Sequence, residues 1–176
     1  MTRLFALAGL ATLCAHAWAA APVPRKAPEF MIVEPSGKQT RLSSFKGKVV
    51  VMEFLDTMCP HCQHASLMLT MLHQQLGPRG FQPIGIAAYN NAPPQVLGFL
   101  KQFSPSYPVG VSDNDTVIKF LGFSPDDRVM VPQIAVIDRK GVIRAQSPPM
   151  SDRNLQDQDY MRTLIDALLK EGAPSK

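Results

Sequence analysis

The chain has 176 residues, of which 45% are hydrophobic and 18% are charged, so we expect one globular domain and neither a disordered chain nor a coiled coil. All 16 prolines follow residue 21, which argues against a fold built mainly of long helices. The net charge of +4 is modest and no run of Lys and Arg forms a basic stripe, so we expect no nucleic-acid partner.

Residues 1–21 have the pattern of a secretory signal peptide. Arg3 gives a positive start, an apolar run follows, and Trp18 lies in a small-x-small cleavage site that ends at Ala19. A retained membrane anchor is the alternative, although the apolar run is short for a bilayer. Export would place the chain in the bacterial periplasm, where the environment is oxidising and disulfides can persist.

A linker and then three strands are expected after this segment. Residues 22–28 are expected to be an extended, solvated linker, followed by one domain over residues 29–172. A short hairpin is expected over residues 30–42, around Gly37. The apolar run Val49–Leu55 is rich in β-branched residues and predicts a buried central strand.

A helix is predicted directly after this strand, over Pro60–Leu76. Its apolar residues recur every three or four positions and so form one helical face: Cys62, Ala65, Leu69, Leu72 and Leu76. Pro60 suits the first helical position, and Gly77 with Pro78 ends the run.

The rest of the chain continues the alternation of strands and helices. Two more strands and two more helices are expected in the middle of the chain, over residues 83–89, 95–103, 107–111 and 114–121. Gln133–Ile137 and residues 142–145 predict an antiparallel hairpin with Gly141 in its turn. An amphipathic helix over residues 160–169, stopped by Gly172, closes the chain. This order predicts an α/β domain with a central mixed β-sheet flanked by helices.

The strongest chemical feature is the motif Cys59-Pro60-His61-Cys62. A C-x-x-C motif at a helix start places Cys59 at the positive end of the helix dipole, which stabilises a thiolate. Cys62 would lie one turn further on the inner side, so Cys59 is the candidate attacking thiol and Cys62 the resolving thiol. His61, a partly cationic neighbour, would stabilise the thiolate further and make the disulfide more oxidising.

Two other roles are open to this motif. A purely structural disulfide would constrain the unfolded chain little, because its loop is so short. Cys59, His61, Cys62 and His64 are all metal-ligand types, but the exported chain has no second cysteine pair and His73 is the last histidine. We therefore expect no metal and no cofactor, and keep a non-catalytic module that binds metal or a partner as the alternative function.

Two positions outside the motif complete the candidate site. Glu53 interrupts the apolar strand six residues before Cys59. If it is buried, its pKa is raised and it suits a proton acceptor for Cys62; the alternatives are exposure to solvent or pairing with a lysine. Pro132 is tolerated as the first residue of a strand, or it forms a cis peptide beside the dithiol that exposes the Val131 backbone to a bound peptide.

Residues 28 to about 170 resemble the thioredoxin-like superfamily, specifically the exported thiol–disulfide oxidoreductases of the TlpA/ResA type and the related AhpC/TSA-like group. The resemblance is carried by Pro28-Glu29-Phe30, LSSFKGKVVV, EFLDTMCPHC, Tyr107-Pro108-Val109 and VPQIAVIDRKGV. It implies a thioredoxin-like fold with an N-terminal hairpin and a strand–helix insertion before Pro132.

The resemblance also implies roles for single residues and partners. Cys59 becomes the nucleophile, Cys62 the resolving thiol, Pro132 the cis-proline and Glu53 the buried acid. Protein thiols and disulfides of the cell envelope are the implied substrates, and a membrane electron-transfer protein is a candidate redox partner. We expect a monomer, because no long exposed apolar pattern stands out in the sequence.

The chain departs from that family in two ways. Met58 stands where the family usually has a tryptophan, and Pro60-His61 is similar to the pair in DsbA-type oxidants, so the fold and the dithiol point in opposite redox directions. Peroxiredoxin chemistry is the competing hypothesis. Its active-site pattern is Pro-x-x-x-Thr-x-x-Cys, but here Met52 occupies the proline position and Asp56 the threonine position.

Overall fold

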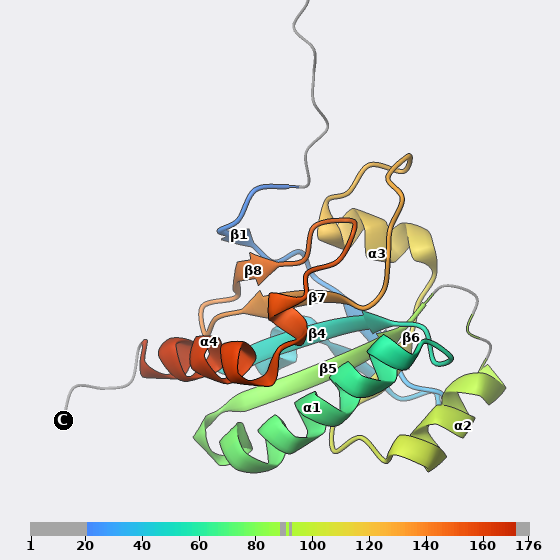
Figure 1. The fold of residues 1–176 in the computed structure, drawn as a ribbon, viewed down its shortest axis with the longest axis horizontal. Coiled ribbons are helices and arrows are strands. Elements are labelled where there is room, and N and C mark those ends of the chain that lie inside the picture. The colour runs from blue at the N-terminus through green and yellow to red at the C-terminus, as the bar shows by residue number, and fades with distance from the viewer. Residues whose placement is uncertain (1–20, 89–90, 92, 172–176) are drawn as a thin grey trace, which may run out of the picture.

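A computed structural model describes residues 21–88, 91 and 93–171, which form one mixed sheet with helices packed on both faces (Figure 1). The signal peptide expected over residues 1–21 lies, except for Ala21, outside the described residues. Among the residues that are described, no helix has the length and apolar character needed to cross a membrane.

The sheet is built from eight strands in the described part of the chain, in the order β1-β8-β7-β4-β5-β6-β2-β3. Their bounds are β1 Arg25–Lys26, β2 Met31–Val33, β3 Gln39–Arg41, β4 Val49–Leu55, β5 Phe81–Ala87, β6 Val109–Val111, β7 Gln133–Ile137 and β8 Val142–Gln146. β4, β5 and β6 run parallel, whereas all other neighbours are antiparallel. The mixed sheet and the thioredoxin-like fold are thus confirmed.

Four α-helices and three short 3-10 helices connect these strands in the described residues. Their bounds are η1 Leu42–Phe45, α1 Pro60–Leu76, η2 Gly77–Arg79, α2 Pro93–Phe103, α3 Asn114–Leu121, η3 Asn154–Gln156 and α4 Gln158–Lys170. α3 and α4 begin at aspartate caps: the side chain of Asp113 accepts a hydrogen bond from Thr116 N, and that of Asp157 accepts one from Tyr160 N.

Alternation along β4 divides the core into two layers. Val49, Val51 and Leu55 lie in one apolar cluster with the inner residues of α1 and α4, while Val50, Met52 and Phe54 lie in a second cluster with α3. Successive side chains of a strand point to opposite faces of the sheet. Glu53 therefore faces the same side as its neighbours Val51 and Leu55, beneath α1.

Most of the expected elements are present, with shifts of at most two residues at their ends. The hairpin expected over residues 30–42 is β2–β3, and the helix predicted over Pro60–Leu76 is α1. Between β5 and β7, where the strand–helix insertion is expected, the chain forms α2, β6 and α3. Gly141 turns between β7 and β8 at a φ of 79°, in the region that favours glycine. Gly172 lies outside the described residues.

The segment expected to be a linker, residues 22–28, contributes a strand to the sheet. Arg25 and Lys26 pair with Ile143 and Val142 at the edge of β8. The Arg25 guanidinium also donates hydrogen bonds to the carbonyl oxygens of Phe120 and Leu121. The sequence gives no sign of this pairing, because a two-residue strand has too few side chains to show alternation.

Truncation of a side chain in the apolar cluster beneath α1 should lower the stability of the fold. Leu72 is fully buried on α1, so Leu72→Ala should lower the free energy of unfolding by about 2–5 kcal/mol, measured by denaturant titration. Leu67 on the same helix is 43% exposed, and Leu67→Ala should cost no more than about 1 kcal/mol. Equal losses in the two variants would contradict this assignment of the helix faces.

Candidate redox site

The dithiol lies where β4 ends and α1 begins, at one end of the sheet. Cys59 is the N-cap residue of α1, in an extended conformation, and Pro60 occupies the first helical turn. Cys62, in the first turn of α1, points to the inner face of the helix and belongs to the apolar cluster beneath it. The side chain of Cys59 makes no capping hydrogen bond; its Sγ instead lies 4.0 Å from the carbonyl oxygen of Val131.

The short connection between β4 and α1 is fixed by hydrogen bonds. Asp56 Oδ1 accepts from Met58 N at 2.8 Å, and Asp56 O accepts from Cys59 N at 3.1 Å. Thr57 N donates to Asn91 Oδ1 at 3.0 Å, while Gln63 Nε2 donates to Thr57 O at 2.9 Å. The backbone before Cys59 is therefore held from both sides, and the thiol has a defined place at the helix start.

The two thiols differ sharply in their access to solvent. Cys59 is partly exposed, whereas Cys62 has no exposed surface, and both are free thiols. Burial raises the pKa of Cys62 far above its ordinary value, and the nearby carboxyl of Glu53 raises it further. A partner molecule can therefore reach Cys59 but not Cys62.

Glu53 lies in the core beneath this helix. It is fully buried, which rules out the solvent-exposed position, and Ser66 Oγ donates a hydrogen bond of 2.6 Å to its Oε2. Its other oxygen, Oε1, has no hydrogen-bond partner among the residues that the structure describes. Burial raises the pKa of Glu53 to about 8, although the hydrogen bond from Ser66 opposes that rise. The carboxyl is thus neutral over much of the neutral pH range and close to its titration point.

Ser66 and Tyr107 are parts of this buried polar group that the sequence reasoning missed. Tyr107 Oη donates to the carbonyl oxygen of Ser66 at 3.2 Å, and the buried phenol also lies near the Glu53 carboxyl. Ser66 follows Cys62 by four residues on the same helix, which places both on the inner face. A serine at that spacing, facing an acidic residue on a buried strand, is the signal that could have found it.

The segment with Val131 and Pro132 lies against the dithiol from the other side. The Val131–Pro132 peptide bond is cis. Buried Gln133 donates through Nε2 to the carbonyl oxygens of Met130, Pro148 and Pro149, at 2.6–3.1 Å. These bonds tie the segment before β7 to the loop after β8, so that the Val131 carbonyl has a fixed position beside Cys59.

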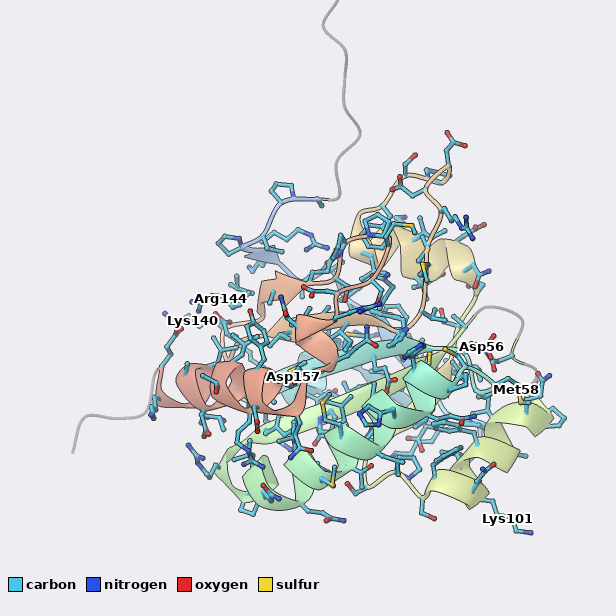
Figure 2. All side chains as sticks on the ribbon, in the orientation of Figure 1. Asp56, Met58, Lys101, Lys140, Arg144 and Asp157 are labelled. Atoms are coloured by element: carbon cyan, nitrogen blue, oxygen red, sulfur yellow. The ribbon has the colours of Figure 1, made fainter. Side chains whose placement is uncertain are left out.

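The remaining predicted site residues lie at the surface around Cys59. His61 and Pro60 are exposed on the first turn of α1, and Met58 is 74% exposed. Figure 2 shows Met58 and Asp56 at the same end of the molecule. Among the described residues, no group of three or more His, Cys, Asp or Glu side chains is placed to hold a metal ion. The structure thus brings the predicted residues together around the dithiol, with Cys59 partly exposed and Glu53 buried beneath α1.

The chain is similar to known proteins over most of its length. The Redoxin family model matches residues 22–164 of the chain. A thiol-disulfide oxidoreductase ResA from Bacillus thuringiensis subsp. konkukian is 27% identical over 121 residues, which cover 69% of this chain and 66% of that relative. The chain thus spans just under two thirds of that relative's length. The ResA of Bacillus subtilis is 24% identical over 150 residues, covering 85% and 76%.

A solved structure extends the likeness to three dimensions. The crystal structure of a thiol:disulfide interchange protein of the thioredoxin family from Chlorobium tepidum matches with a TM-score of 0.70 and 26% identity. The match covers 85% of this chain and 99% of that one.

Titration of Glu53 should make the stability of the reduced protein depend on pH. Its pKa is raised from about 4.5 to about 8 by folding, so the unfolded chain loses this proton first as pH rises. The free energy of unfolding should therefore fall between about pH 4.5 and pH 8, relative to that of Glu53→Gln. Denaturant titrations of both proteins at pH 5, 7 and 9 measure this difference.

Two further variants control this experiment. Exposed Glu171→Gln should not reproduce the effect. Ser66→Ala should extend the fall to higher pH, because it removes the hydrogen bond that stabilises the ionised carboxylate. A difference between wild type and Glu53→Gln that stays constant from pH 5 to pH 9 would contradict the burial of a titrating carboxyl.

Proposed function

The chain belongs to the Redoxin family, and on that premise we propose that it is a thiol–disulfide oxidoreductase that exchanges disulfides with protein substrates through Cys59 and Cys62. The observation that carries the proposal is the division of the dithiol into a partly exposed Cys59 and a fully buried Cys62. An exposed thiol can form a mixed disulfide with a partner, and a buried neighbour can resolve it.

The reductive reaction proceeds in two balanced steps. The Cys59 thiolate attacks a substrate disulfide, so that a Cys59–substrate bond forms and one substrate sulfur leaves as a thiolate. The Cys62 thiolate then attacks Cys59, forms the Cys59–Cys62 disulfide and releases the second substrate thiolate. Two electrons pass from the protein to the substrate, and the oxidative reaction is the same sequence in reverse.

Glu53 has a role in the second step. Cys62 must lose its proton to attack, and burial makes that loss unfavourable. In the molecules in which Glu53 is ionised, its carboxylate is proposed to accept this proton, and its pKa of about 8 keeps proton transfer in both directions accessible near neutral pH. Ser66 holds the carboxyl in place through Oε2 and leaves Oε1 free for the proton.

The Val131 backbone supplies the contact for a substrate chain. Its carbonyl oxygen lies 4.0 Å from Cys59 Sγ. An extended substrate segment that places its cysteine over Cys59 can donate a backbone hydrogen bond to this carbonyl, as a strand does at a sheet edge. Such a contact depends on the peptide backbone and therefore suits many protein substrates.

The proposed location is the bacterial periplasm, after removal of residues 1–21 as a signal peptide. Support comes from the charged start and the apolar run of that segment. The proposed partners are envelope proteins with thiols or disulfides and a membrane electron-transfer protein that restores the dithiol. The protein is proposed to act as a monomer.

Removal of the resolving thiol should trap the reaction halfway. Cys62→Ser should accumulate mixed disulfides between Cys59 and substrate proteins, because the second step is lost. The trapped species are measured on non-reducing gels of the protein isolated from its host, with mass spectrometry of the excised bands.

Cys59→Ser is the matched control and should trap nothing, because Cys62 is inaccessible. No trapped partner for Cys62→Ser under either reducing or oxidising conditions would contradict the proposed function. Stoichiometric metal in the purified protein, lost in Cys59→Ser, would support the binding module instead.

His61 should tune the redox potential of the couple. The imidazole of His61, exposed on the first turn of α1 beside Cys59, is proposed to stabilise the thiolate and hence the reduced form. His61→Ala should shift the reduction potential to more negative values by roughly tens of millivolts, where about 30 mV corresponds to a tenfold change in the equilibrium constant. Equilibration with glutathione measures the shift, and exposed His64→Ala should leave the potential unchanged. Equal shifts in both variants would contradict a specific role of His61.

A further inference from the structure

A cavity of about 290 Å³ lies far from the dithiol, where the chain before β2, helix η1 and the turn between β7 and β8 meet. Val50, the second residue of β4, is one of its lining residues, whereas Cys59 follows the other end of that strand. In Figure 2, Lys140 of this cavity and Met58 beside the dithiol lie at opposite ends of the molecule. A ligand in this cavity would not contact Cys59.

The walls of the cavity are bonded to one another through the backbone. Ala27 N donates to Gly141 O at 2.9 Å, which joins the N-terminal segment to the turn between β7 and β8. Gly47 N donates to Arg139 O at 3.1 Å, which joins that turn to the segment before β4. The cavity is therefore a formed part of the fold, as ligand pockets commonly are.

The charged side chains around the cavity leave an excess of positive charge. Four lysines line it: Lys26, Lys46, Lys48 and Lys140. Among the residues that the structure describes, none of the four has a carboxylate within ion-pair distance. Lys48 donates to the neutral side chain of Gln82, at 3.2 Å.

The two carboxylates that line the same cavity are already occupied. Glu29 Oε1 accepts hydrogen bonds from Phe30 N and Ser43 N, both at 3.1 Å. Asp138 Oδ1 accepts from two backbone N–H groups of the β7–β8 turn, and its Oδ2 pairs with Arg144 at 3.1 Å. Neither acid forms an ion pair with one of these lysines, and four ammonium groups against two carboxylates leave the lining with an excess of positive charge that an external anion can balance.

The cavity also has an apolar part. Leu42, Phe45, Val50 and Ile137 contribute to its lining. Its volume is at the small end of the range for small-molecule pockets, about 300–1,000 Å³. We propose that the cavity binds a small amphiphilic anion, in which a phosphate, sulfonate or carboxylate group contacts the lysines and a short apolar body enters between the side chains. This inference stands independently of the dithiol chemistry.

Octyl phosphate is the probe that tests this site, by calorimetric titration of the full chain below the micelle concentration. It should bind saturably, inorganic phosphate should bind more weakly, and octyltrimethylammonium should not bind. The double variant Lys46→Glu/Lys140→Glu should weaken binding by about tenfold or more. Lys101 is exposed on α2 and remote from the cavity, so Lys101→Glu should bind as wild type does.

Unchanged binding by the double variant, or equal binding of the cationic amphiphile, would overturn the proposal, as would no binding of octyl phosphate. The double variant should keep the wild-type rate of disulfide exchange, which shows that it folds and separates this test from that of the dithiol. Sedimentation with vesicles of phosphatidylglycerol, compared with phosphatidylcholine, then identifies the source of the anion. If the protein binds phosphatidylglycerol vesicles and the lysine substitutions weaken that binding, the anion is a lipid headgroup. If the protein binds octyl phosphate but not these vesicles, the anion is a free ligand.

Discussion

Desolvation beneath the first turn of α1 is the constraint on which the proposed chemistry depends. Within four residues, the helix passes from a partly exposed thiol at Cys59 to a fully buried thiol at Cys62. Cys62 and the carboxyl of Glu53 lie in the same solvent-excluded part of the core, where the charged form of either group is unfavourable. The same burial that keeps Cys62 protonated also keeps Glu53 able to exchange a proton near neutral pH. The burial beneath α1 thus separates the proposed attacking thiol, Cys59, from the proposed resolving thiol, Cys62.

This environment follows from the alternation of β4 as much as from the helix. Glu53 points to the α1 side because Val51 and Leu55 do, and each of those is part of the apolar cluster under α1. A shift of one residue in the register of β4 would turn the carboxyl toward α3 and remove it from the dithiol. The register of β4 with β5 and β7 therefore determines that Glu53 faces the dithiol, independently of the side chains in the Cys59–Cys62 motif.

The sequence predicted the dithiol helix, the central strand and the mixed sheet because these elements carry strong periodicity or a marked motif. It could not show the burial of Glu53, since the depth of a strand residue depends on which helix covers it. Ser66 and Tyr107 were missed for the same reason: they meet Glu53 only through packing between segments far apart in the chain. The pairing of β1 with β8 was missed because it consists of backbone bonds over two residues.

The central claim is that burial, rather than the spacing of the motif alone, divides the roles of the two thiols. Its most direct measurement is the rate at which iodoacetamide alkylates each cysteine of the reduced protein, followed by mass spectrometry of the separated peptides. The account predicts that Cys59 reacts readily, while Cys62 reacts only as fast as the surrounding structure opens. Alkylation of both thiols at similar rates in the folded protein would contradict it.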